Sequence, residues 1–176
     1  QRTRCIRDGI SAAVGALTWM EVEWVKTGKP TVVGIATGMV AGLATITPAS
    51  GTVGPQGAML IGLMAGLICF YATQLIKGYF KIDDSLDVFP VHGVGGIVGI
   101  LMLAFVGKPD GFLGAGSAGF EPSVFDQFFI QLQGVIIICL WTLVFSWVAI
   151  KVTSLLTQLR VDEESENEGL DMTEHN

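Results

Sequence analysis

The sequence predicts an all-α protein, a multi-pass transmembrane bundle of about five helices. The first observation is composition: 51% of the residues are hydrophobic and only 15% are charged, whereas a soluble domain carries roughly 25% charged residues. The second is distribution, because the charges gather in clusters and leave long uncharged runs between them. A helix needs about 20 mostly apolar residues to cross the hydrocarbon core of a bilayer. The runs near or above this length are 31–49, 53–76, 88–107 and 127–150.

We expect a transmembrane domain over residues 10–160, between a short charged start and an acidic tail. The first span is the weakest, because Glu21 and Glu23 directly follow its uncharged part. The tail, residues 161–176, is rich in Asp and Glu and lacks aromatic residues, a composition typical of a solvated segment. The expected start is 1–9, and the expected spans are 10–25, 31–49, 55–76, 88–107 and 127–158.

Basic residues predict which side of the membrane each connection faces. With five alternating spans, Lys26, Lys29, Lys77 and Lys81 share one side with the end of the last span. Short cytoplasmic loops are enriched in Lys and Arg. We therefore expect an integral membrane protein, in the plasma membrane, with a cytoplasmic C-terminus. The arginines within residues 2–7 then fall on the side opposite the cytoplasm. Either the first segment does not cross the membrane as predicted, or further sequence precedes it.

Small residues recur at every fourth position within the apolar runs. In lipid, such ridges allow helix backbones to approach closely. Most of these glycines are therefore expected to pack helix against helix rather than to hold a ligand. The ridges are Gly34, Gly38 and Gly42, then Gly62 and Gly66, then Gly95 and Gly99.

His92 is the one ionisable side chain inside a long apolar run. Such a group is costly in hydrocarbon, so it usually faces a cavity, a partner or a pathway. An apolar site favours the neutral imidazole, whose one donor and one acceptor can pass a small polar molecule or relay a proton. The structural alternative is a histidine that bonds a neighbouring helix carbonyl. A single histidine cannot hold a metal by itself, and we expect no metal, no cofactor and no enzymatic activity.

Three acidic residues, Asp83, Asp84 and Asp87, precede the span that contains His92. Aspartate near a helix N-terminus accepts hydrogen bonds from free backbone N–H groups and interacts favourably with the helix dipole. We therefore interpret these residues as helix caps. They are not expected to form a hydrolytic carboxylate pair, because the sequence shows no accompanying nucleophile.

The segment 83–99, Asp-Asp-Ser-Leu-Asp-Val-Phe-Pro-Val-His-Gly-Val-Gly-Gly-Ile-Val-Gly, resembles the second signature of the Amt/Mep/Rh ammonium transporters. Two further groups of residues, 28–51 and 159–175, contain stretches similar to the bacterial-type Amt branch. They are Gly28 to Thr31, Ala41 to Ala44 and Ile46 to Gly51, and, in the tail, Leu159 to Val161, Glu168 to Asp171 and Glu174 to His175. The resemblance covers the chain from about Ala12 to its end and corresponds to the C-terminal half of the transporter fold.

The resemblance implies a homotrimer with one narrow apolar pore in each subunit and two stacked histidines in each pore. His92 resembles the second histidine of that pair, Val88 an apolar pore-lining position, and Thr47 a position near the outer recruitment region. Ammonium would be recruited outside, deprotonated, and passed as ammonia with the proton following separately. The tail would pack on the cytoplasmic face and link the pore to gating and to a PII-type signalling protein. The tail residues concerned are Glu168, Gly169, Leu170 and Asp171.

The chain also departs from the family pattern. The family's first half, with the partner histidine, is absent, and residues 2–8 carry charges where the family has small uncharged residues. We therefore expect the chain to act as part of a larger transporter, with ammonium or ammonia and membrane lipid as its partners and no role for nucleic acid. The alternatives are an ammonium sensor of the Amt type and a non-conducting truncated fragment.

Overall fold

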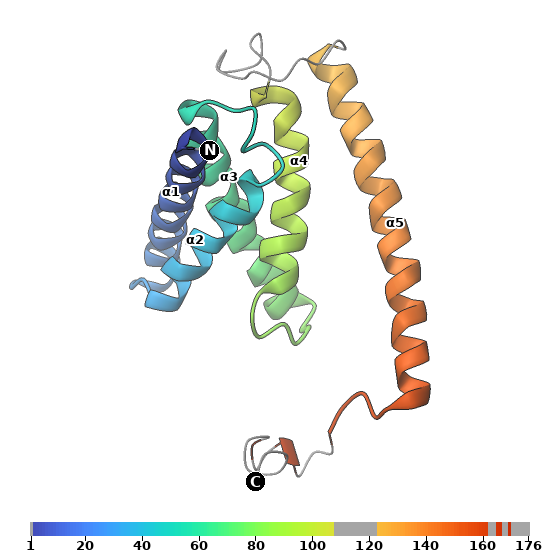
Figure 1. The fold of residues 1–176 in the computed structure, drawn as a ribbon. Helices are drawn as coiled ribbons and strands as arrows, with labels where there is room; N and C mark the ends of the chain where they lie inside the picture. The colour runs from blue at the N-terminus through green and yellow to red at the C-terminus, as the bar shows by residue number, and fades with distance from the viewer. Residues whose placement is uncertain (1, 108–122, 162–164, 167–168, 170–176) are drawn as a thin grey trace. The chain divides into compact units, whose positions relative to one another are not determined.

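The computed structural model describes residues 2–107, 123–161, 165–166 and 169, and the predicted all-α class is confirmed in these ranges. The chain divides into two compact units, Gln1–Val135 and Ile136–Asn176, which are described separately. The helices of Figure 1 are α1 (Arg2–Thr27), α2 (Val32–Ile46), α3 (Pro55–Thr73), α4 (Gly95–Val106) and α5 (Val124–Leu156). Two π-helical turns, η1 (Gln74–Tyr79) and η2 (Phe89–Val94), extend α3 at its end and α4 at its start.

Within the described residues, three helical stretches are long and apolar enough to cross a membrane: Pro55–Tyr79, Phe89–Val106 and Val124–Leu156. Helix α2 is apolar but has only 15 residues, which corresponds to a rise of about 22 Å. Helix α1 begins at Arg2, not at Ile10, so the charged start is part of the helix. The predicted span at 31–49 is also longer than α2, because residues 47–52 form turns.

Local sequence signals explain where the first helices end and begin. Gly28 takes a positive φ of 82°, and its N–H donates to the carbonyl of Trp24 at 2.9 Å, which closes α1. Thr31 caps α2, because its Oγ1 accepts a hydrogen bond from the N–H of Gly34 at 3.0 Å. The carboxylate of Glu23 accepts from the N–H and the hydroxyl of Thr31 at 3.0 and 2.8 Å. This side chain therefore joins the last turns of α1 to the start of α2.

Small residues allow α1, α2 and α3 to pack closely in the bundle of Figure 1. A Cβ on Gly15 would lie 2.6 Å from the carbonyl oxygen of Gly38, and one on Gly66 would lie 2.7 Å from that of Gly15. The hydroxyl of Ser11 donates to the carbonyl of Gly42 at 2.9 Å across the α1–α2 contact, where both residues are buried. The expected role of the glycine ridges in close helix contacts is therefore observed for α2 and α3.

In the part of the chain that the structure describes, buried apolar side chains form two clusters. One lies around the turn after α2 and includes Ile46, Val53, Ile61 and Val106. The other consists of Trp19, Ala41, Cys69, Phe70 and Val91, with the rings of Trp19 and Phe70 edge to face at 5.3 Å. Because Val91 belongs to this second cluster, the core fixes the backbone on which the next residue, His92, stands.

Helix α5 is apolar along most of its 33 residues, and none of them is buried. Exposed Ile, Leu, Val, Phe and Trp side chains occur all along it. A helix that is apolar all round is typical of a membrane span, where lipid or neighbouring helices surround it.

Candidate functional site

His92 lies in the π-helical turn η2, at the start of the α4 span. Its neighbours Pro90 and Val91 are buried, whereas the imidazole itself is exposed. A π-helical turn inserted into an α-helix is uncommon and frequently occurs at a functional site. The core therefore holds the backbone of η2 while the imidazole stays accessible.

An open pocket of about 330 Å³ lies beside His92. One wall comes from α2, and the other comes from Leu86, Val91 and His92. The α2 residues recur three and four positions apart, so they form one face of that helix. They are Val32, Val33, Ala36, Thr37 and Val40. The sequence predicted His92 but missed these α2 residues, whose helical spacing was the available signal.

The pocket wall is apolar apart from the imidazole of His92 and the hydroxyl of Thr37. The Thr37 hydroxyl donates its proton to the carbonyl of Val33 at 2.9 Å. Its oxygen lone pairs therefore remain available as acceptors. A small polar molecule in this pocket would meet few hydrogen-bonding groups, and the imidazole is the only one of them that can both donate and accept through separate atoms.

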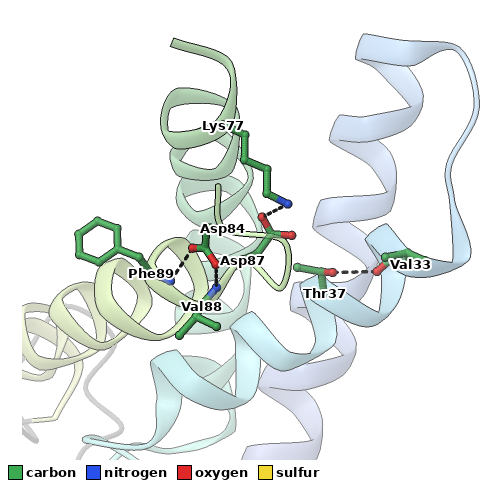
Figure 2. A network of polar contacts seen from close by, with 7 residues as sticks. All are labelled: Val33, Thr37, Lys77, Asp84, Asp87, Val88 and Phe89. Carbon is green, nitrogen blue, oxygen red and sulfur yellow. Dashed lines mark hydrogen bonds and ion pairs between the residues drawn. The ribbon is translucent and has the colours of Figure 1, made fainter. Parts of the chain in front are cut away.

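Asp84 organises the backbone that leads into η2. Its Oδ1 accepts from the N–H of Val88, and its Oδ2 accepts from the N–H of Phe89, each at 2.9 Å. Figure 2 shows both bonds on one carboxylate. Free N–H groups at a helix start are satisfied in this way. Asp83, which the sequence grouped with Asp84, is exposed.

Asp87 makes a different contact from the one that the sequence suggested for it. Its Oδ1 lies 2.7 Å from the Nζ of Lys77, so an ion pair joins η1 to the short segment that leads into η2 (Figure 2). The Asp87 side chain is only 14% exposed, and its φ is 55°, a left-handed conformation that Asp tolerates better than most residues. From the sequence, Lys77 was used only to predict which side of the membrane its connection faces, and its pairing with Asp87 was not predicted.

The structure does not bring the other two predicted pore residues into this pocket. Val88 precedes η2, is 53% exposed, and lies outside the pocket wall. Thr47 follows the C-terminus of α2, and its hydroxyl donates to the carbonyl of Leu43 at 2.8 Å. Its position along α2 is about 10 Å beyond Val40, so it belongs to the opposite end of that helix from Val32.

Only part of the tail segment predicted to be regulatory is described. Glu168, Leu170 and Asp171 lie outside the described residues. Gly169 has a φ of 96°, and its N–H donates to the carbonyl of Ser165 at 3.1 Å. Arg160, which belongs to the family-like stretch Leu159 to Val161, forms an ion pair with Glu166 at 2.9 Å within the same unit.

The apolar spans and the nearly apolar pocket define the class of the molecule: it is an α-helical integral membrane protein. The sequence model of the Ammonium Transporter Family matches residues 2–176. The chain belongs to this family, which confirms the resemblance found in the sequence.

Similar proteins cover nearly all of this chain. It is 40% identical to an ammonium transporter of Aquifex aeolicus over 97% of its own length and 39% of the relative's. It is 38% identical to one of Bacillus subtilis, over 97% of its length and 42% of the relative's. The chain thus spans about two fifths of the length of these relatives.

Solved structures are also similar in fold to this chain, and two of them illustrate the similarity. A protein described as a sensor Amt protein superimposes with a TM-score of 0.88 at 27% identity, over 99% of this chain and 42% of that one. Mep2 of Saccharomyces cerevisiae has a TM-score of 0.76 at 30% identity, over 88% of this chain and 38% of Mep2. Both likenesses support the predicted membrane helical bundle.

Proposed function

We propose that the complete gene product transports ammonium or ammonia across a membrane, and that this chain contributes the His92 pocket to the pathway. The observation that carries the proposal is one imidazole in an otherwise nearly apolar pocket, held by a π-helical turn. Family membership and relatives named ammonium transporters support the substrate. Because the relatives are named as transporters, no catalytic activity is proposed.

The pocket chemistry suits a small molecule that can lose its charge. An apolar wall cannot replace the hydration of ammonium, so the charged form is strongly disfavoured there. Ammonia needs only one or two hydrogen bonds, and a neutral imidazole supplies one donor and one acceptor. We therefore propose that His92 contacts the neutral molecule, while the proton leaves or travels separately. Val88 and Thr47 are proposed to line the same pathway outside the pocket.

A sensing function is the second candidate, and one fold relative is described as a sensor. It is less well supported, because the relatives with the higher sequence identities are named ammonium transporters. Transport and sensing also make different demands on the pocket. A transporter must release ammonium on the far side, whereas a sensor only needs to bind it.

Orientation and assembly are further parts of the proposal. The cationic connections at Lys26, Lys29, Lys77 and Lys81 favour a cytoplasmic position for that end of the bundle, and hence for the C-terminus, in a plasma membrane. The resemblance supports a homotrimer, and the exposed apolar surface of α5 is compatible with lipid or protein neighbours. We propose that the tail around Gly169, including Glu168, Leu170 and Asp171, regulates transport and contacts a PII-type protein.

An uptake experiment tests the transport proposal. The complete gene product is expressed in a host that lacks its own ammonium transporters, and uptake of labelled methylammonium is measured at low external concentration. We expect saturable uptake that ammonium competes away and potassium does not. Uptake equal to that of the empty host, with the protein present in the membrane, would contradict the proposal. Binding of ammonium without uptake would instead favour the sensor.

A further inference from the structure

One residue in the wall of the His92 pocket does not belong to a helix. Leu86 lies in the loop of residues 80–88, which joins η1 to η2, whereas the other wall residues lie on α2 or in η2. A helix fixes its residues through repeated backbone hydrogen bonds, but a loop residue needs other contacts to fix it. The position of Leu86 in the wall therefore depends on the contacts that hold this loop.

The backbone of the 80–88 loop has an uncommon conformation near both of its ends. Lys81 has a φ of 52° and Asp87 a φ of 55°, and within the described residues these are the two positions other than glycine with a positive φ. Side chains of L-residues disfavour this left-handed conformation. Such residues persist where surrounding contacts hold them, and they gather at functional sites. A specific contact is therefore needed to hold the Asp87 end of the loop.

The ion pair between Lys77 and Asp87 supplies that contact (Figure 2). Lys77 lies within η1, which continues α3, so the pair ties the loop to that helix. The Asp87 side chain is only 14% exposed, and a partly buried pair is screened by salt much less than a surface pair. The carbonyl of Asp87 also accepts a hydrogen bond from the N–H of Val91 at 3.0 Å. Asp87 is thus joined to η1 through its side chain and to η2 through its backbone.

The ion pair acts next to the pocket wall, because Asp87 directly follows Leu86 in the chain. Holding Asp87 therefore limits how far Leu86 can move away from the opposite wall, which α2 provides. The distance between these two walls decides how large a molecule fits beside His92. In an apolar pocket, room for one additional methylene group changes kcat/KM by roughly 10- to 200-fold. A small displacement of Leu86 is thus enough to change which amine the pocket favours.

We propose that Lys77 and Asp87 are positioning residues that set the size selectivity of the His92 pocket, for ammonium against methylated amines, by holding Leu86 in the wall. With the ion pair formed, Leu86 stays opposite α2 and the pocket is narrow. Without it, Asp87 relaxes toward a negative φ, Leu86 withdraws, and the pocket gains room for a methyl group. This inference rests on the proposed transport function, because the transported amine must pass through the pocket.

Competitive uptake by the complete gene product tests the selectivity role. A host that lacks its own ammonium transporters is supplied with labelled ammonium and labelled methylammonium together, at equal low concentrations. The ratio of the two initial uptake rates then equals the ratio of the kcat/KM values for the two amines. The amount of folded protein affects both rates equally, so a variant that folds less efficiently still gives a valid ratio.

Lys77→Met and Asp87→Asn should each raise the ratio of methylammonium to ammonium uptake severalfold, up to about tenfold, the lower end of the discrimination for one methylene group. Asparagine tolerates a positive φ as aspartate does, so Asp87→Asn removes the charge without a new backbone preference. Leu86→Ala enlarges the pocket directly and should raise the ratio in the same direction. Lys77→Arg retains the charge and should restore the ratio of the unsubstituted protein.

Lys81→Asn is the matched control, because Lys81 has nearly the same φ in the same loop but forms no ion pair in the part of the chain that the structure describes. Its ratio should equal that of the unsubstituted protein, and a rise as large as that of Lys77→Met would overturn the proposal in favour of loop charge in general. Ratios that stay within about twofold for both Lys77→Met and Asp87→Asn would also overturn it.

Two further outcomes would separate the parts of the argument. A raised ratio in Lys77→Met with an unchanged ratio in Leu86→Ala would refute the action through Leu86. Absence of uptake of both amines by the unsubstituted protein, with that protein present in the membrane, would contradict transport itself and the selectivity role with it. Uptake with an unchanged ratio would leave transport standing and would remove only the selectivity role.

Discussion

Substituting Gly99 with alanine tests the close contact between α4 and α2 that supports the His92 segment. A Cβ on Gly99 would overlap the carbonyl oxygen of Thr45, with its carbon at 2.9 Å and the Cδ of Pro48 at 3.3 Å. The overlapping atoms belong to the backbone of α2, so no side-chain rotation can relieve them. Alanine at this position must therefore push α4 away from α2.

The size of the effect follows from a comparison with Gly96, on the same helix. A Cβ on Gly96 would meet nothing within 4 Å, so Gly96→Ala changes mainly helix propensity, a gain of up to about 1 kcal/mol. Gly99→Ala has the same gain plus an overpacking cost of about 1–3 kcal/mol. The propensity gain cancels between the variants. We expect the difference in the free energy of unfolding to lie near the upper end, about 2–3 kcal/mol, because the clash is with backbone.

The assay is unfolding of the complete gene product in detergent micelles, followed by circular dichroism. Gly99→Ala should unfold at a lower temperature or denaturant concentration than Gly96→Ala, and the wild type should lie between them or close to Gly96→Ala. Equal stability of the two alanine variants would refute the packing argument. It would mean that α4 does not approach Thr45 as closely as the structure indicates.

Two further substitutions test polar contacts that hold the site. Asp84→Ala removes both acceptors for the N–H groups of Val88 and Phe89, and it should lower the free energy of unfolding by about 1 kcal/mol, as loss of a helix cap does. Hydrogen exchange at these two amides should accelerate. Unchanged exchange would contradict the capping role of Asp84. Ser11→Ala removes the buried hydrogen bond to the carbonyl of Gly42. It should lower the free energy of unfolding in micelles by about 0.6 kcal/mol, the average for a hydrogen bond between membrane helices. A gain in stability would show that this bond does not stabilise the fold.

Much of the fold could be predicted from the lengths of the uncharged runs and from the spacing of the glycines. The uncharged runs at 53–76 and 88–107 correspond closely to the helical stretches Pro55–Tyr79 and Phe89–Val106. Every-fourth-residue glycines predicted close backbone contacts because only small residues permit them in lipid. These signals are local in sequence, so they could be recognised without any knowledge of the partner helix.

The start of α1 could not be predicted in the same way. Charges in residues 2–8 indicated a segment outside the span, yet α1 begins at Arg2. Arg7 donates from Nη1 to the carbonyl of Val53 at 2.6 Å, across 46 positions of sequence. A contact between residues so far apart has no local pattern, so the sequence could not show that this charge has a partner.

The candidate site was predictable only in its central residue. His92 was recognisable because an ionisable group inside an apolar run is costly. The α2 wall around Val33 and Thr37 depended on how α2 packs beside η2, and the ion pair of Lys77 with Asp87 depended on the bend between η1 and η2. Both are tertiary relationships, which charge and hydropathy patterns do not specify.

The ammonium-evoked current of the complete gene product in proteoliposomes, compared with that of His92→Ala, tests most directly whether His92 lies in the ammonium pathway. Val25→Ala serves as the control, because Val25 is exposed and lies outside the His92 pocket. One hydrogen bond contributes up to about 1.5 kcal/mol, which corresponds to as much as about tenfold in rate. His92→Ala should lower the current about tenfold or alter its proton coupling, while Val25→Ala should leave both unchanged. A His92→Ala protein with the current and ion selectivity of the unsubstituted protein would remove His92 from the ammonium pathway.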